Sequence, residues 1–179
     1  MPRYTAYYCE ENIWHLCAER RGAGLASTVL LVTNPDRRTV LFQQRAADPG
    51  QPIVWDYHVI LLSLSDDGTW LVWDLDTRLA MPLPFPDYAA LTFAPPGVLA
   101  PSFEPRFRVI DGGDWLAGFS SDRSHMRKKN GLYRAPPPPW PVIVVPGAPS
   151  FLSWLDEDAA GPGQWMSLRQ LLTRFQKAD

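Results

Sequence analysis

The stretch at residues 54–77, VWDYHVILLSLSDDGTWLVWDLDT, decides the fold. Val, Ile, Leu, Trp and Tyr dominate on either side of the Ser-Asp-Asp-Gly turn at 65–68, so the stretch predicts two strands, at 54–64 and 70–75. Residues of both parities in the first strand are mainly apolar. That pattern is typical of a strand that is covered on both faces, in the middle of a sheet.

The same hairpin carries one imidazole and three carboxyl groups, on Asp56, His58, Asp74 and Asp76. Titratable groups among apolar residues are costly unless they are paired. If these groups lie on one face of the sheet, the histidine acquires an acidic neighbour, which is the arrangement of a base and its orienting group in hydrolytic triads.

The turn determines whether they can meet. A three-residue loop with Gly68 in the left-handed conformation sets Ser65 opposite Thr69 and places His58 near both downstream aspartates, with Asp56 joining them by the period of two. A two-residue loop shifts the register by one residue and sends the histidine to the other face. The glycine in third place favours the first register.

The overall composition indicates one globular domain, spanning residues 1–179. Hydrophobic residues make up 46% of the chain, yet no apolar run is long enough to cross a membrane, and the first residues lack the apolar core of a signal peptide. A net charge of −2 shows no general attraction to nucleic acid or anionic lipid. The basic cluster at 123–129 is interpreted as a solvated loop. We expect a cytoplasmic monomer with no nucleic-acid or membrane partner.

Residues 9–21 predict a helix with acids in its first turn, arginines in its last turn and Gly22 after it. Cys9 therefore starts the helix, where backbone N–H groups stabilise a thiolate, although Glu10 and Glu11 act in the opposite direction. Cys17 is expected in the core. The two cysteines lie two helical turns apart, about 12 Å, too far to form a disulfide, so both are predicted to be free thiols in a reducing compartment.

Further elements follow from propensity and capping signals. Strands are predicted at 27–33, 39–43, 107–110 and 142–145, and helical segments at 87–92, at 114–119 with Asp114 as N-cap, at 150–155, and after a capping box of Ser167 and Gln170.

Each candidate residue has a structural alternative: a cysteine at a helix start, a histidine in an apolar strand and an aspartate at a strand end are all common without catalysis. Their order changes the interpretation. A cysteine at a helix N-terminus followed by a histidine and an aspartate in two adjacent strands is the layout of papain- and transglutaminase-like cysteine hydrolases. A metal site built from Cys9, His58 and Asp74 is a weaker alternative, because no metal-binding spacing such as CxxC or HExxH accompanies these residues.

The sequence also resembles one family. YYCEENIW, VWDYHVILL, WDLDT followed by LPFP, FRVI, SDRSHM, and a run of four prolines followed by Trp-Pro look like the protein N-terminal glutamine amidohydrolase family and occur in the family's order. The resemblance implies deamidation of the side chain of an N-terminal glutamine to glutamate with release of ammonia. It implies a catalytic triad of Cys9, His58 and Asp74, no cofactor or metal, and an α+β fold, an α-β-α sandwich around a mainly antiparallel sheet.

A substrate with a free N-terminus carries an ammonium group, and Glu10, Glu11 and Asp56 are our candidates for its counter-charge. For the glutamates the structural alternative is complementation of the helix dipole; for the aspartate it is a hydrogen bond within the strand. The partners implied are proteins or peptides with a free N-terminal Gln, whose new N-terminal Glu is a potential degradation signal. Another papain- or transglutaminase-like thiol hydrolase, and a non-catalytic reader of protein N-termini, remain alternatives.

Overall fold

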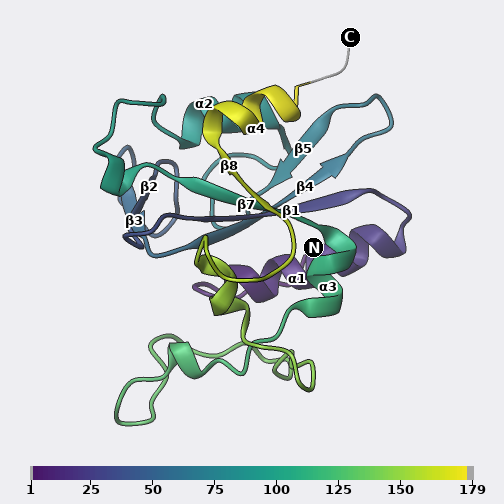
Figure 1. Cartoon of the computed structure of the whole chain (residues 1–179), viewed down its shortest axis with the longest axis vertical. Coiled ribbons are helices and arrows are strands. Elements are labelled where there is room, and N and C mark those ends of the chain that lie inside the picture. Colours follow the sequence, from purple (N-terminus) through teal and green to yellow (C-terminus); the bar gives the residue numbers. More distant parts are fainter. Residues whose placement is uncertain (1, 177–179) are drawn as a thin grey trace.

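The central part of the stretch at residues 54–77, from His58 to Trp73, forms a hairpin within a six-stranded antiparallel sheet in a computed structural model that describes residues 2–176 (Figure 1). The strands run in the order β6-β5-β4-β1-β7-β8. Their bounds are β1 Ser27–Thr33, β4 His58–Leu64, β5 Trp70–Trp73, β6 Leu83–Pro84, β7 Arg106–Asp111 and β8 Gln164–Ser167. β2 (Thr39–Leu41) and β3 (Ile53–Trp55) form a separate two-stranded sheet.

The register of the central hairpin is the one that the glycine favours. Leu61 pairs with Trp73 and Leu64 with Trp70. The backbone N–H of Ser65 donates to the Thr69 carbonyl at 3.0 Å, and Gly68 has a φ of 80°. The three-residue loop is therefore confirmed.

The first strand of the hairpin is shorter than predicted, because the β-structure is interrupted at Asp56 and Tyr57. The Asp56 carboxylate accepts a hydrogen bond from the Tyr57 N–H at 2.9 Å, and the Asp56 carbonyl accepts one from the Thr33 hydroxyl at 2.7 Å. Local bonds of this kind compete with the strand ladder. The prediction of one continuous strand through Asp56 is thus wrong: Asp56 is exposed at the break between the two sheets, although it lines the same cavity as His58.

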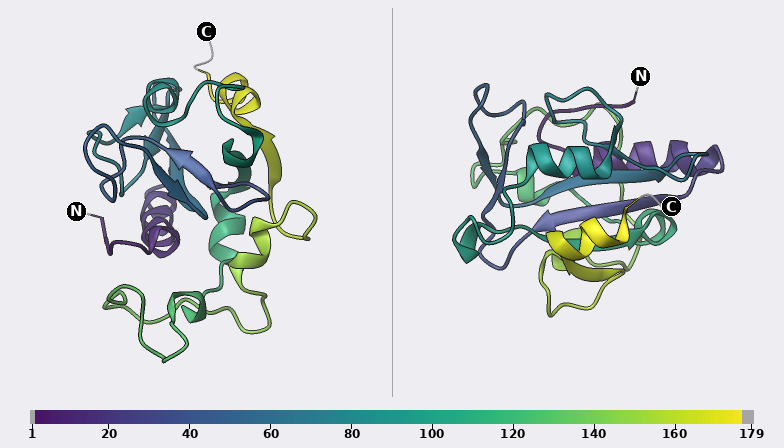
Figure 2. Two further views of the ribbon diagram at one scale, coloured as in Figure 1. Left: turned by 90° about the vertical axis from the view of Figure 1, so that its left-hand side faces the viewer. Right: turned by 90° about the horizontal axis from the view of Figure 1, so that it is seen from above.

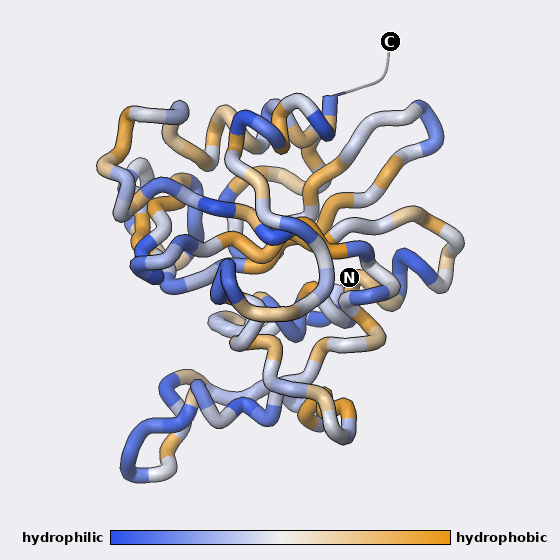
Figure 3. The backbone as a smooth tube through the Cα atoms, viewed as in Figure 1, coloured by the Kyte–Doolittle hydropathy of each residue, from blue (hydrophilic) through white to orange (hydrophobic). Residues whose placement is uncertain are grey.

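Helices cover both faces of the large sheet (Figure 2). On one face lie α1 (Cys9–Gly22) and α3 (Gly112–Gly118); on the other lie α2 (Phe85–Thr92) and α4 (Leu168–Arg174). Alternation along β1 supplies both cores, since Leu31 packs with Ile13 and Trp115, whereas Leu30 packs with Phe85. Many of the most hydrophobic residues of the chain lie in these central strands (Figure 3).

Several of the other predicted elements are confirmed, and others are not. The helix at α1, the strand at β1 and the capping box of Ser167 and Gln170 are confirmed. The helix expected to be capped by Asp114 begins earlier, because the Asp111 carboxylate accepts from the Gly113 N–H at 2.7 Å.

The predicted strand at 142–145 is wrong, because only a single bridge forms there, between Ser121 and Ile143. The sheet edge is taken instead by β8, which pairs with β7. The solvated-loop interpretation of residues 123–129 fails at Arg123, whose exposed fraction is 5%. Within residues 2–176, none of the helices combines the length and apolarity needed to cross a membrane.

Candidate functional site

The first turn of α1 places Cys9 against the sheet. Cys9 is the first residue of the helix and follows the N-cap residue Tyr8. Its side chain is buried in a cluster with Tyr57 and Val59, the two residues that flank His58 in the chain. The thiol is free, as is that of Cys17. The packing of α1 on β4 therefore brings Cys9 to the N-terminal end of β4, where His58 is the first residue.

A buried hydrogen bond joins His58 to Asp74: the imidazole Nε2 lies 2.9 Å from the carboxylate Oδ1. Both residues are almost completely buried. Burial disfavours protonation of the ring, but the charge and hydrogen bond of Asp74 outweigh it and raise the pKa of His58. Burial likewise opposes the Asp74 anion, yet His58 and further hydrogen bonds hold its pKa below the ordinary value.

Three further donors complete the hydrogen bonding of Asp74, two side chains and one neighbouring backbone N–H. The Gln44 amide and the Tyr88 hydroxyl each donate to Oδ2 at 2.8 Å, and the Asp76 backbone N–H donates to Oδ1 at 3.0 Å. All of these bonds stabilise the ionised carboxylate. Sequence reasoning missed Gln44 and Tyr88, and no sequence signal marks them, since a glutamine in a loop and a tyrosine in α2 acquire this role only through the fold.

A cavity of about 790 Å³ opens beside these residues. Cys9 and His58 both line it, as do Asp56 and Asp76. The Trp55 ring stacks on the imidazole, with ring centroids 6.0 Å apart and planes inclined by 13°. The cavity thus exposes a thiol and an imidazole whose orientation is fixed on one side by a carboxylate and on its face by an indole.

The remaining predicted acids occupy different positions. Glu10 is fully buried, and its Oε2 accepts from the Cys9 thiol at 3.6 Å. Among the described residues its other oxygen, Oε1, has no hydrogen-bond partner, and His125 Nε2 lies 3.5 Å from it. Asp56 is exposed and lines the cavity. Glu11 is paired with Arg123, and neither Glu10 nor Glu11 lines the cavity.

The surroundings of Cys9 keep its thiol protonated. Burial raises its pKa well above the ordinary value, and the charges of Glu10 and Asp76 raise it further, while a backbone hydrogen bond from Val59 acts in the opposite direction. Burial is also the main reason that the pKa of Cys17 rises to about 12, which leaves that thiol an inert core residue as expected.

A metal-binding alternative can be tested on the donor atoms. Among the described residues, His58, Asp74 and Asp76 each offer one ligand atom, and these atoms lie within 4.8 Å of one another. Both oxygens of Asp74 already accept hydrogen bonds, as described above, and so does Oδ1 of Asp76, from the Tyr4 hydroxyl at 2.8 Å. A cation would have to displace these bonds, so the donor set is occupied by the protein's own hydrogen-bond network.

An α+β fold that brings a thiol and an imidazole to one cavity, with a carboxylate hydrogen-bonded behind the imidazole, has the residue types of a thiol hydrolase. The comparisons identify the family. Residues 4–175 match the family described as N-terminal glutamine amidase, and the chain belongs to that family.

Similar proteins are found in vertebrates and in insects. The protein is 39% identical to protein N-terminal glutamine amidohydrolase of Bos taurus, over 96% of this chain and 86% of the relative. It is 39% identical to the enzyme of the same name from Homo sapiens, over 78% and 70% of the two chains. The Drosophila ananassae enzyme of that name is 35% identical over 98% and 89%.

Proposed function

We propose that the protein hydrolyses the side-chain amide of an N-terminal glutamine in proteins or peptides, giving glutamate and ammonia. The observation that carries the proposal is a single cavity lined by Cys9 and His58, with Asp74 hydrogen-bonded behind the imidazole. The relatives' names give the same activity. In fold terms we place the protein with the papain- and transglutaminase-like cysteine hydrolases, whose order of cysteine, histidine and aspartate it shares.

The chemistry follows from the atoms at the site. Because Nε2 of His58 is held by Asp74, Nδ1 is the ring atom that takes the Cys9 thiol proton. The sulfur attacks the amide carbon, and backbone N–H groups at the start of α1, including that of Cys9, stabilise the oxyanion. The imidazolium returns its proton to the departing nitrogen, which leaves as ammonia. His58 then deprotonates a water that cleaves the thioester, and the glutamate carboxylate and the free thiol are formed.

Recognition of the free N-terminus falls to the acids near Cys9. In glutamine four bonds separate the ammonium nitrogen from the amide carbon, a span of at most about 5 Å, so the counter-charge must lie close to the sulfur. Glu10 contacts the thiol through Oε2, and its buried Oε1 accepts no hydrogen bond from the described residues and lies 3.5 Å from His125 Nε2, while Asp56 lines the cavity. We assign the ammonium to these two acids. Glu11 is not favoured for this role because Arg123 already pairs with it.

The deciding experiment measures ammonia release from a peptide that begins with Gln. We expect release by the wild-type protein, none above background with Cys9→Ala, and none from the N-acetylated peptide. Peptide-bond cleavage or amine incorporation would assign the site to a different thiol enzyme. Binding of the peptide without ammonia release would make the protein a reader of N-termini and would overturn the proposal.

The proposed setting is the cytoplasm, supported by two free thiols that fit a reducing compartment. The monomeric state stays a prediction, which size-exclusion chromatography with light scattering checks.

A further inference from the structure

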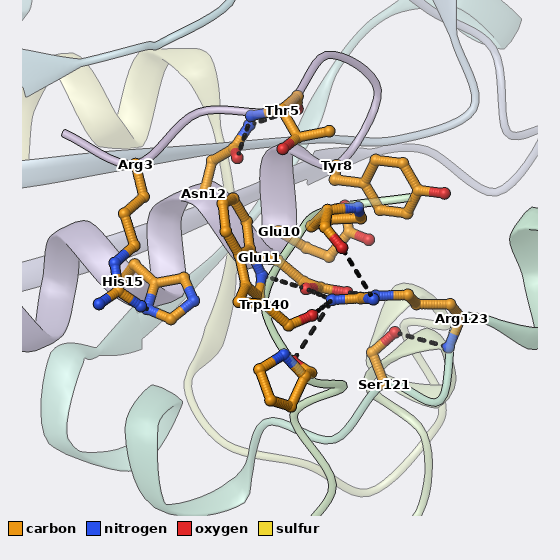
Figure 4. Close-up of polar contacts among 12 residues, drawn as sticks. Arg3, Thr5, Tyr8, Glu10, Glu11, Asn12, His15, Ser121, Arg123 and Trp140 are labelled. Carbon is orange, nitrogen blue, oxygen red and sulfur yellow. Dashed lines mark hydrogen bonds and ion pairs between the residues drawn. The ribbon is translucent and has the colours of Figure 1, made fainter. Parts of the chain in front are cut away.

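A buried ion pair ties a long loop to the helical turn that carries Cys9. The Arg123 guanidinium donates from Nε to Glu11 Oε1 and from Nη2 to Oε2, each at 2.7 Å (Figure 4). The two side chains are 6% and 0% exposed. Two parallel charge-assisted bonds fix both the distance and the orientation of the planar groups they join.

The pair is completed by further hydrogen bonds. The Trp140 indole N–H donates to Glu11 Oε2 at 2.7 Å, and Arg123 Nη2 donates to the Trp140 carbonyl at 2.9 Å. Figure 4 shows the guanidinium and the indole converging on the same carboxylate. A buried pair of this kind is tolerated only when its remaining donors and acceptors are satisfied, and here the loop itself satisfies them.

A second contact holds the returning arm of the same loop. The Tyr8 hydroxyl donates to the Ala135 carbonyl at 3.2 Å. Tyr8 directly precedes Cys9, and Glu11 follows it by two residues, so the two attachment points bracket the nucleophile within one helical turn. We call residues 123–135, which lie between the attached ends, the anchored loop.

The anchored loop supplies one wall of the cavity. His125, Met126, Arg134 and Ala135 all line it together with Cys9. His125 Nε2 lies 3.2 Å from the Tyr57 hydroxyl, on the cavity side of the sheet. Much of the loop is hydrophilic, and it projects from the body of the molecule (Figures 1 and 3). It therefore buries little apolar surface that would hold it in place, and its position depends on its polar anchors.

We propose that Arg123 and Glu11 are positioning residues, which set the anchored loop at a fixed distance from Cys9 and so complete the pocket for the residue that enters it. This inference rests on the proposed function, since the pocket in question is that for N-terminal glutamine. It gives the second glutamate of the CEEN motif a task distinct from that of Glu10.

The test compares Glu11→Gln and Arg123→Lys with the wild-type chain. Each keeps a side chain of similar size but removes the two-pronged charged contact. We expect KM for a Gln-initiated peptide to rise about tenfold or more while kcat stays within about threefold, because a wall that binds substrate and transition state alike acts on KM. Tryptic cleavage after Lys128 and Lys129 should become faster than in the wild type. The rate of alkylation of Cys9 by iodoacetamide should stay within about threefold of the wild-type rate.

Two controls separate positioning from general destabilisation. Leu171→Ala removes a buried side chain from α4, on the opposite face of the sheet, and should lower the melting temperature without raising KM. Trp140→Phe keeps a ring but deletes one donor to Glu11; it should raise KM by less than the charge variants, and it provides the test if those variants do not fold.

The outcomes are distinct. An unchanged KM in variants whose loop is cut faster would make the ion pair a structural tie only, and a fall in kcat at constant KM would place Glu11 or Arg123 in the chemistry instead; either result overturns the inference. Absence of ammonia release by the wild type would sink the proposed function. In that case the tryptic cleavage rates still test whether the ion pair anchors the loop. Faster cleavage of Glu11→Gln and Arg123→Lys than of the wild type would support the anchoring, and equal rates would contradict it.

Discussion

At Cys9 the nearest charges are negative, and this is unusual for a nucleophilic thiol. Reactive cysteines ordinarily lie beside cations, which lower the thiol pKa. Here burial, Glu10 and Asp76 all raise it. A positively charged ligand near these acids would therefore favour formation of the thiolate. A substrate ammonium placed among these acids offsets their charge, so the binding of a free N-terminus also removes part of the barrier to forming the thiolate.

This reasoning predicts opposite effects of Glu10→Gln on the thiol and on the enzyme. Loss of the charge beside the sulfur lowers the pKa of Cys9, and while the thiol is mostly protonated a pKa lower by one gives about ten times more thiolate. Alkylation by iodoacetamide at pH 7.5 should therefore be faster than in the wild type. Deamidation should become slower, with kcat/KM reduced about 10- to 100-fold, because a charged hydrogen bond to the substrate ammonium is lost.

Glu19→Gln is the matched control, since Glu19 is exposed on the same helix and should alter neither rate. Parallel changes in the two rates, both faster or both slower, would show that Glu10 does not act through the charge of the bound N-terminus.

At the scale of elements, the β4–β5 hairpin brings His58 and Asp74 together, and its loop sets the register. Gly68 has a φ of 80°, and a Cβ built there would meet no other atom within 4 Å. A substitution to alanine therefore costs backbone strain alone. Ile60, Leu62 and Val72 are buried within the hairpin and oppose a shift of register, so the pairing should survive the strain.

Gly68→Ala should lower the free energy of unfolding by about 1–2 kcal/mol, the cost of a left-handed conformation for a residue with a Cβ. Deamidation by the folded protein should be unchanged. Gly22→Ala, at the end of α1, is the control: it too meets no atom within 4 Å, but its φ is not positive, so it should be neutral or stabilising. Urea unfolding of the three proteins measures the difference. A loss of activity in folded Gly68→Ala would mean that the turn, and not the core, fixes the register.

The elements that were predictable from sequence are those that local residues determine. The glycine turn fixed the hairpin pairing, and the Ser167 capping box marked the start of α4, because the relevant contacts lie within a few residues. The break at Asp56 was missed because an apolar run on both sides of it reads as one strand. At the break, the Asp56 carboxylate accepts from the neighbouring Tyr57 N–H and the Asp56 carbonyl accepts from Thr33, a residue in another strand. The strand wrongly predicted at 142–145 failed for a related reason, since propensity does not reveal which segment reaches the sheet edge.

The candidate site divides in the same way. Cys9 could be placed from helix signals, and His58 and Asp74 from the hairpin register. The partners that surround them could not, since Tyr88 reaches Asp74 from α2 and Arg123 reaches Glu11 across 112 residues of chain. Contacts of that kind exist only after the sheet and its covering helices have assembled.

For the whole molecule, the His58–Asp74 pair makes stability depend on pH. The pKa of His58 is raised above its ordinary value in the folded state. Its contribution is therefore fully present below the unfolded pKa of about 6.5 and is lost as the pH rises through the folded value. The pKa of Asp74 is lowered, so its contribution is present above the unfolded value of about 3.9 and is lost as the pH falls further. Between these limits both groups stabilise the fold.

We therefore expect the free energy of unfolding, measured by urea titration, to be greatest near pH 5–6 and to fall as the pH rises toward 8.5, by about 1.4 kcal/mol for each pH unit that separates the folded and unfolded pKa values of His58. Asp74→Asn should be less stable at pH 6 and should lose much less stability over that interval, because burial of the ring is then opposed only by Asp76 and Glu10. Asp76, whose pKa is also raised, contributes a decline of the same sign as the pH rises through its folded pKa. NMR titration of the His58 ring in both proteins checks the cause directly. Equal slopes for the two proteins between pH 6 and 8.5 would mean that Asp74 does not raise the pKa of His58, and the pair would then not be the source of the pH dependence of stability.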